Sequence, residues 1–442
     1  MQLRKGSSGR GLMLAARHLA NGALAGMIGL AAATLLPAQA PVMTTLYTFT
    51  VGSAGWDPVG NLVRDANGAL YGVTSGGGGV SPFCTDGCGV VFQLAPPAVS
   101  GGAWTYNVLY SFQGESDGAG PNGPLVFDAQ GNLYGTTEGG GAVVNEAYTG
   151  TVFELTPPTV PGDPWTHTIL ATFPTVAEGT APAGSVVFGA DGALYGFTSQ
   201  GGAFADSDLG GVAFQLTPPA GAGAWNYNVL HSFEPNVDGY SPTGAPVFDK
   251  HGRLYGVTAG SLSETAYGQL FVLTPPATAG DAWGEHLLYG IPNSVSGVVF
   301  GPDGSLYGTT EHGGINCDEG CGTVVQFQPP ASAGGAWTQN VIYEFAGGHD
   351  GQLPFNPPVV GPSGKVYGTT DAGGSANAGT IYGLTPPSTP GGAWTKLLLH
   401  TFEGTDGRFP LSGIILAPGG VIYGTTNRGG GAGVGVVFEL SL

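Results

Sequence analysis

A Tyr-Gly dipeptide stands at seven regularly spaced positions along this chain of 442 residues, at intervals of 52 to 63 residues. Each copy stands in the same order of short apolar runs and turn signals. A regular spacing of this length is the mark of repeat architectures, in which each copy is one structural unit. The chain is therefore expected to fold as seven like units. The repeated tyrosines are Tyr71, Tyr134, Tyr195, Tyr255, Tyr307, Tyr367 and Tyr423.

Each copy contains four short apolar or alternating runs, which we call strands a to d. In the second copy they span residues 124–127, 132–137, 151–156 and 165–173. The sequence Asp-Ala-Gln-Gly at 128–131 predicts a tight a–b hairpin, because glycine readily takes the positive φ that such a turn needs. Pro157-Pro158 ends strand c, since proline has no N–H for a sheet ladder. No run has helical spacing, so an all-β fold is expected.

Seven four-stranded units predict a seven-bladed β-propeller, and the ends of the chain indicate that the ring is closed. The last copy stops after strand c at 436–440, and the run 45–49 near the N-terminus resembles the fourth-strand run 108–112. We therefore expect the N-terminal strand to complete the last blade, giving a single domain over 41–442. The blade repeats are expected to begin near residues 58, 121, 182, 242, 295, 354 and 410.

The repeat also resembles a known family. The pattern Asp-Gly-x-Leu-Tyr-Gly-Thr-Thr, then Gly-Gly, then Gly-Thr-Val-Phe-x-Leu-Thr-Pro-Pro is similar to the Gloeo-Verruco (GloVer) tandem repeat of exported bacterial proteins. The likeness covers about residues 58–442, and Tyr-Gly-Thr-Thr stands intact at Tyr134, Tyr307, Tyr367 and Tyr423. The resemblance implies an extracellular location and no established activity.

The first forty residues have the features of a secretory signal peptide. Basic residues precede an apolar run at 22–36, and Pro-Ala-Gln-Ala at 37–40 offers cleavage after Ala38 or Ala40. No later stretch reaches ~18 apolar residues, so no membrane span is expected in the mature chain. We expect a monomer that is secreted or lies in the periplasm or on the surface of a bacterium. The net charge of −19 argues against nucleic acid as a partner.

Loop lengths differ between the two expected faces of the ring. The a–b connection has the same length in every copy, whereas the b–c and d–a connections vary. In a propeller the two variable connections share one face, and variable loops on a rigid frame are where binding sites tend to lie. We therefore place any function on this b–c/d–a face.

The d–a connections carry a repeated acidic residue followed by glycine. Ring closure should bring these acids toward one face, where they could bind Ca²⁺, whose ligands are oxygen atoms, or a basic partner. The favoured alternative is an Asp-Gly turn in which each carboxylate bonds its own backbone. No other cofactor is expected. The residues are Asp117, Glu178, Asp238, Asp350 and Asp406.

Three more acids, Glu138, Glu311 and Asp371, directly follow strand b. Paired carboxylates hydrolyse glycosidic bonds in many enzymes, so these side chains could serve a glycoside hydrolase or lyase. The other copies carry Ser, Ala or Asn here, and this irregular placement favours a non-catalytic role.

Other residues that could carry chemistry have simpler explanations. His231 and His400 occupy a strand-d position that is Tyr in several copies, so packing is expected of them rather than catalysis or metal binding. The sequence contains no Ser nucleophile elbow, His-Glu-x-x-His motif or P-loop. We therefore name no catalytic residue.

The four cysteines form two Cys-x₃-Cys pairs, Cys84/Cys88 and Cys317/Cys321, both in b–c connections. In an exported chain such pairs predict local disulfides. A shared Cys₄ zinc site is the alternative, and it is disfavoured because the two pairs belong to blades far apart in the ring.

Together these features predict an exported, non-enzymatic propeller that binds a protein or a glycan through its b–c/d–a face. A carbohydrate-active enzyme on the same frame is the alternative, and a purely structural envelope component is a third possibility.

Overall fold

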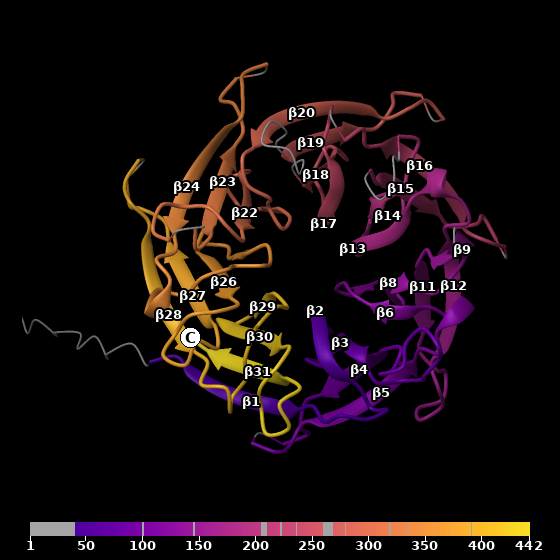
Figure 1. The fold of residues 1–442 in the computed structure, drawn as a ribbon, viewed down its shortest axis with the longest axis horizontal. Helices are drawn as coiled ribbons and strands as arrows, with labels where there is room; N and C mark the ends of the chain where they lie inside the picture. Colours follow the sequence, from indigo (N-terminus) through magenta and orange to yellow (C-terminus); the bar gives the residue numbers. More distant parts are fainter. Residues whose placement is uncertain are drawn as a thin grey trace, which may run out of the picture. The chain divides into compact units, whose positions relative to one another are not determined.

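Seven sheets of short antiparallel strands surround a central axis in the residues that the structure describes (Figure 1). The structure is a computed structural model. The predicted signal peptide, residues 1–40, lies outside the described residues except for Ala40. The predicted all-β seven-bladed propeller is confirmed. The described ranges are 40–99, 101–144, 146–204, 210–221, 223–235, 237–259, 268–278, 280–317, 320–332, 334–389 and 391–442.

Each blade runs from an innermost strand a to an outermost strand d (Figure 1). Blade 1 contains β2 (Trp56–Arg64), β3 (Leu70–Gly76), β4 (Val90–Ala95) and β5 (Thr105–Ser111). Blade 2 contains β6 (Ala119–Pro121) and β7 (Val126–Phe127) in the first position, then β8 (Leu133–Gly139), β11 (Thr151–Thr156) and β12 (Thr166–Thr172). Blade 3 contains β13 (Thr180–Phe188), β14 (Leu194–Gln200), β15 (Val212–Thr217) and β16 (Asn226–Ser232). Blade 4 contains β17 (Tyr240–Phe248), β18 (Leu254–Ala259), β19 (Gly268–Thr274) and β20 (Gly284–Ile291).

The remaining blades follow the same order. Blade 5 contains β21 (Val299–Phe300), β22 (Leu306–Thr310), β23 (Thr323–Gln328) and β24 (Thr338–Glu344). Blade 6 contains β25 (Val359–Val360), β26 (Val366–Thr370), β27 (Thr380–Thr385) and β28 (Thr395–Thr401). Blade 7 contains β29 (Ile414–Ala417), β30 (Val421–Thr426), β31 (Val436–Ser441) and, from the start of the chain, β1 (Val42–Thr48).

The ring closes as the sequence predicts. Strand β1 pairs antiparallel with β31, from Val42 opposite Ser441 to Thr48 opposite Val436 (Figure 1). The N-terminal strand thus takes the strand-d position of the last blade. Strand β31 would otherwise be an unpaired edge, and β1 covers it as the fourth strand of the blade.

The repeated Tyr-Gly and Trp residues join neighbouring blades. In blade 3 the ring of Tyr195 contacts Trp283 of blade 4 at 5.9 Å between centroids, and its hydroxyl donates to Asp191 of the a–b hairpin at 2.8 Å. A Cβ on the following Gly196 would lie 2.5 Å from the ring of Phe214. Only glycine therefore fits beside this buried phenylalanine, which explains the dipeptide.

A repeated backbone hydrogen bond between blades fixes the loops of the b–c/d–a face. The residue before the first proline of strand a has φ between 48° and 60° in five blades, a left-handed conformation that is unfavourable for residues other than glycine. Its N–H donates to a carbonyl of the preceding blade, as Leu353 does to Cys321 at 2.9 Å. This inter-blade bond holds each d–a loop against the neighbouring b–c loop. The five residues are Asp57, Ala181, Ser241, Leu353 and Phe409.

The variable loops carry small elements of their own. Three short 3₁₀ helices lie in described d–a loops: η1 (Glu115–Asp117), η2 (Val176–Glu178) and η3 (Gly348–Asp350). The b–c loop of blade 2 forms a hairpin from β9 (Val143–Val144) and β10 (Ala147–Tyr148). Among the described residues, no helix has the length and apolar character needed to cross a membrane.

Candidate functional site

The b–c loops of blades 1 and 5 are each closed by a disulfide, Cys84–Cys88 and Cys317–Cys321. The predicted local pairing is confirmed. With all four cysteines oxidised, none is available as a thiolate ligand for zinc. Disulfides of this kind form and persist in oxidising compartments such as the periplasm and the extracellular space.

An exposed phenylalanine of the blade 1 b–c loop packs on a half-buried tyrosine of the blade 2 b–c loop. Phe83 is 64 % exposed, and its ring packs edge-on against Tyr148 of β10 at 4.7 Å between centroids. The backbone is restrained at both residues, because Phe83 precedes the Cys84–Cys88 disulfide and Tyr148 lies in the β9–β10 hairpin. Six further apolar residues on described b–c and d–a loops are at least half exposed: Val51, Val80, Val143, Phe204, Val237 and Ile315.

The five acids of the d–a loops each accept a hydrogen bond from a backbone N–H of their own loop, as the turn alternative predicts. Their role as Ca²⁺ ligands stays a prediction. The donor and acceptor pairs are Gln113 to Asp117 at 2.8 Å, Thr175 to Glu178 at 3.2 Å, Glu234 to Asp238 at 2.5 Å, Ala346 to Asp350 at 2.8 Å and Glu403 to Asp406 at 2.8 Å.

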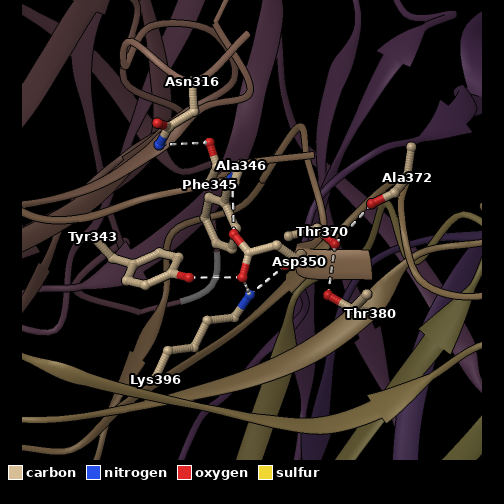
Figure 2. Close-up of polar contacts among 9 residues, drawn as sticks. All are labelled: Asn316, Tyr343, Phe345, Ala346, Asp350, Thr370, Ala372, Thr380 and Lys396. Carbon is tan, nitrogen blue, oxygen red and sulfur yellow. Dashed lines mark hydrogen bonds and ion pairs between the residues drawn. The ribbon is translucent and has the colours of Figure 1, made fainter. Parts of the chain in front are cut away.

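At the boundary between blades 5 and 6 the loop acid joins the two outermost strands (Figure 2). Asp350 accepts hydrogen bonds from the Tyr343 hydroxyl of β24 at 2.7 Å and from Lys396 Nζ of β28 at 2.7 Å. Burial raises the pKa of Asp350, but the bonds from Lys396, Tyr343 and the Ala346 N–H outweigh it and leave the pKa below its ordinary value. Lys396, whose side chain is 8 % exposed, also lies 4.8 Å from the ring centre of Phe345. This cluster is a charge-balanced contact between blades.

The boundary between blades 1 and 2 is built the same way. Asp117 accepts from the Tyr110 hydroxyl at 2.6 Å and lies 3.3 Å from Nδ1 of His167. The rings of Tyr110 and His167 stack at 4.2 Å. Burial raises the pKa of Asp117, but its bonds to His167, Tyr110 and the Gln113 N–H lower it by more.

The boundary between blades 3 and 4 places two acids together. His231 Nε2 of β16 lies 2.7 Å from Asp238 Oδ2 and 3.4 Å from Glu285 Oε1 of β20. The three candidate ligand atoms lie within 4.8 Å of one another. Burial raises the pKa of Glu285, the His231 charge opposes that rise, and the Asp238 carboxylate adds to it.

The cross-blade partners of the loop acids were missed by the sequence reasoning. They all stand at the second position of strand d, opposite an apolar residue of strand c: His167 opposite Leu155, Glu285 opposite Leu273 and Lys396 opposite Leu384. An alignment of the seven strand-d segments at that position would have shown one acid among neutral and basic residues.

Of the three acids that follow strand b, the structure brings two together. Burial and the neighbouring Glu311 carboxylate raise the pKa of Asp371 to about 6, and Arg408 opposes that rise. Asp371 Oδ1 is buried and accepts no hydrogen bond among the described residues. The side chain of Glu311 is 40 % exposed, and its Oε1 lies 3.6 Å from His312 Nε2. Glu138 stands at the end of β8 in blade 2, three blades from Glu311.

The described cavities lie elsewhere. The central channel holds a cavity of about 640 Å³ lined by strand-a residues. Two grooves, of about 910 and 1040 Å³, lie between the a–b hairpins and c–d loops of blades 3 and 4 and of blades 5 and 6. Both grooves contain a repeated tryptophan, Trp283 or Trp394. They open on the face opposite to the variable loops.

The sequence repeat identifies the family. The family model described as the Gloeobacter/Verrucomicrobia repeat matches residues 34–271 and 292–442. The chain belongs to this family. The resemblance inferred from the Tyr-Gly motifs is thereby confirmed. A comparison of this repeat protein with curated proteins finds no match.

Several solved structures are similar to this repeat protein at low sequence identity. A polysaccharide lyase of family PL25, an ulvan lyase, is 10 % identical with a TM-score of 0.50, covering 89 % of this chain and 95 % of its own. A putative glucose dehydrogenase from Thermus thermophilus is 14 % identical with a TM-score of 0.43, covering 90 % and 99 %. A sialidase from Streptococcus pneumoniae is 10 % identical with a TM-score of 0.41, covering 90 % and 70 %. At these identities the likeness concerns the propeller fold alone.

Proposed function

We propose that this protein is an exported, non-enzymatic scaffold that binds a protein partner through its b–c/d–a face. The observation that carries the proposal is the exposed Phe83 ring, packed on the half-buried Tyr148, on loops that contain a disulfide and a hairpin. Aromatic side chains held rigidly at a surface dominate the energy of many protein interfaces, because they bury a large apolar area at a small entropic cost.

Exposed aliphatic side chains favour a protein over a glycan as the partner. Ile315, 89 % exposed, and Val80, 72 % exposed, lie on the same kind of loop as Phe83. Burial of such groups is favourable against another apolar surface, whereas a sugar offers mainly hydroxyl groups. The net charge of −19 would steer a basic partner toward the protein.

The proposal is tested with the mature protein immobilised and exposed to the proteins of its own envelope and medium. Phe83→Ala and Ile315→Ser should each weaken capture of a specific partner at least about tenfold, the loss expected for an interface hot spot. Val99→Ser, a change at an equally exposed c–d residue on the opposite face, is the matched control. Equal loss in all three variants would contradict the proposal, and binding only on a glycan array would replace the partner class.

A carbohydrate-active enzyme is the second candidate, supported by the Glu311–Asp371 pair. A carboxyl group with a pKa of about 6 beside an exposed carboxylate can hold the proton that a general acid donates. Turnover of a panel of polysaccharides by the unaltered protein, lost in Glu311→Gln and Asp371→Asn but kept in Glu138→Gln, would establish it. Absence of turnover across the panel leaves the scaffold as the better account.

Export itself is part of the proposal. The two disulfides fit an oxidising compartment, and residues 1–40 have the features of a signal peptide. Mass spectrometry of the protein from periplasm and medium should find a mature N-terminus at Gln39 or Pro41. A cytoplasmic protein that retains Met1 would contradict export.

A further inference from the structure

We propose that His231, Asp238 and Glu285 form a binding site for a divalent transition-metal ion, with Zn²⁺ as the reference metal, between blades 3 and 4. Its ligands differ from the Phe83, Val80 and Ile315 side chains proposed for partner binding, since they come from the outermost strands β16 and β20 and from the d–a loop that joins the two blades.

The geometry of the three side chains is close to that of a chelate. In a tetrahedral zinc site with bonds of about 2.0 Å, two ligand atoms lie about 3.3 Å apart. The atoms His231 Nε2 and Glu285 Oε1 are 3.4 Å apart, and His231 Nε2 and Asp238 Oδ2 are 2.7 Å apart. A small outward movement of Asp238 opens the second distance, because the metal replaces the proton that joins this oxygen to the imidazole.

The cluster contains more negative charge than its one histidine can balance. Two carboxylates share a single imidazole, and Asp238 is only 4 % exposed. Glu285 Oε1 is buried and accepts no hydrogen bond among the described residues. Buried polar atoms normally have partners, so a carboxylate oxygen with no hydrogen bond, 3.4 Å from a histidine and close to a second carboxylate, supports a bound cation at this place.

The donor set selects the class of metal. Calcium and magnesium prefer oxygen ligands alone, whereas one imidazole with two carboxylates suits Zn²⁺ and neighbouring transition metals. The side chains of His231 and Glu285 are each 20 % exposed, which leaves the outer side of the site within reach of water. Three protein ligands and bound water would complete the coordination.

The other blade boundaries provide an internal comparison. The residue equivalent to Glu285 is the cation Lys396 beside Asp350, or His167 beside Asp117. At the boundary between blades 2 and 3 it is Tyr227, which donates its hydroxyl to the Glu178 carbonyl. At each of these three boundaries, the residue equivalent to Glu285 is a hydrogen-bond donor that faces the d–a loop. The boundary between blades 3 and 4 supplies a second acceptor instead, as a metal site requires.

His400 and Asp406 repeat the first two ligands without the third. They lie 2.8 Å apart, as close as His231 and Asp238. The equivalent of Glu285 at that boundary is Met43, which pairs with Leu440 as Glu285 pairs with Leu273. This second pair is therefore a natural control for zinc binding by a histidine and an aspartate alone.

The experiment is a calorimetric titration of the mature protein with Zn²⁺ after treatment with a chelator. The unaltered protein should bind one equivalent tightly, and Co²⁺ in its place should give the visible absorption of a protein-bound ion. Glu285→Tyr, which copies Tyr227, and Glu285→Gln should each weaken Zn²⁺ binding at least about 100-fold. Loss of a residue that only hydrogen-bonds a metal ligand weakens binding about 10–100-fold, and Glu285 is proposed as a ligand itself. Far-ultraviolet circular dichroism checks that both variants fold.

His400→Phe is the matched control and should leave the affinity for Zn²⁺ within about twofold, since His400 lacks the third ligand. The proposal is overturned if the unaltered protein binds Zn²⁺ no more tightly than Glu285→Gln, or if His400→Phe removes the site. Binding of Ca²⁺ in preference to Zn²⁺ at these residues would also overturn it, because the histidine would then have no role.

Discussion

The boundary between blades 5 and 6 and the boundary between blades 3 and 4 have the same arrangement of loop and strands. They differ in the sign of the charge that the next blade contributes. In both, a loop aspartate bonds a backbone N–H of its own loop and a side chain of the preceding strand d. At the first boundary the next blade contributes Lys396, which balances Asp350 (Figure 2). At the second it contributes Glu285, which adds a second negative charge. One position in the outermost strand thus decides whether the loop aspartate meets a cation or a second carboxylate.

The largest effect is expected from making the complete boundary like the incomplete one. Lys396→Glu places a carboxylate against Asp350 with no histidine between them, and it should lower the free energy of unfolding by about 3 kcal/mol, as the loss of a buried ion-pair partner does. Urea unfolding followed by fluorescence measures the change. Gln339→Glu, at the equivalent position where the described d–a connection has no acid, is the control and should cost less than about 1 kcal/mol. Equal costs would contradict the charge-balance argument.

Removing the loop acid of the complete boundary should have a smaller effect that depends on pH. Asp350→Asn should cost about 2 kcal/mol at pH 7, after allowance for solvent around this half-buried group. The folded pKa of Asp350 is lowered, so its contribution is full above the unfolded value of about 3.9 and is lost as the pH falls through the folded value. Denaturant titrations from pH 7 to pH 3 should therefore show the gap between variant and parent narrowing once the pH falls below about 3.9. A gap that is as large at pH 3 as at pH 7 would assign the cost to the changed shape of the side chain.

The contact between Asp371 and Glu311 on the b–c/d–a face predicts the opposite result, a gain in stability when an acid is removed. The pKa of Asp371 is raised to about 6 in the folded protein, so its ionisation destabilises the fold increasingly as the pH rises from about 4 to 6. Asp371→Asn should then stabilise the protein by about 1 kcal/mol at pH 8, after screening is allowed for. Thermal melts at pH 8 and pH 4 should show the gain only at the higher pH, and a gain at both would refute the electrostatic origin.

The smallest effect is expected from making the incomplete boundary like its neighbours. In metal-free protein, Glu285→Tyr should raise stability by about 0.5 kcal/mol, because it removes a carboxylate whose burial and proximity to Asp238 raise its pKa. With saturating Zn²⁺ the order should reverse, since only the parent gains stability from the bound ion. Melting temperatures with chelator and with Zn²⁺ check both signs. An unchanged order would break the comparison between the two boundaries.

The fold was predictable because its signals are local and repeated. The Tyr-Gly dipeptide, the Pro-Pro pair after strand c and the run at 45–49 each specify a unit or its closure from a few adjacent residues. The Cys-x₃-Cys pairs close loops of five residues, so their partners were fixed by proximity along the chain. By contrast, the partner of Asp350 is 46 residues away, and nothing adjacent to either residue indicates their meeting.

The amino-acid sequence by itself determined that seven like units of four strands would form and that the two ends of the chain would share the last blade, because turns, strand breaks and repeat spacing act over short distances. Only the tertiary structure decided which side chains face each other across blade boundaries: Lys396 with Asp350, Glu285 with His231, and Phe83 with Tyr148. Burial, charge balance and the protonation of a carboxylate depend on neighbours in space, and the packing of one blade on the next supplies those neighbours.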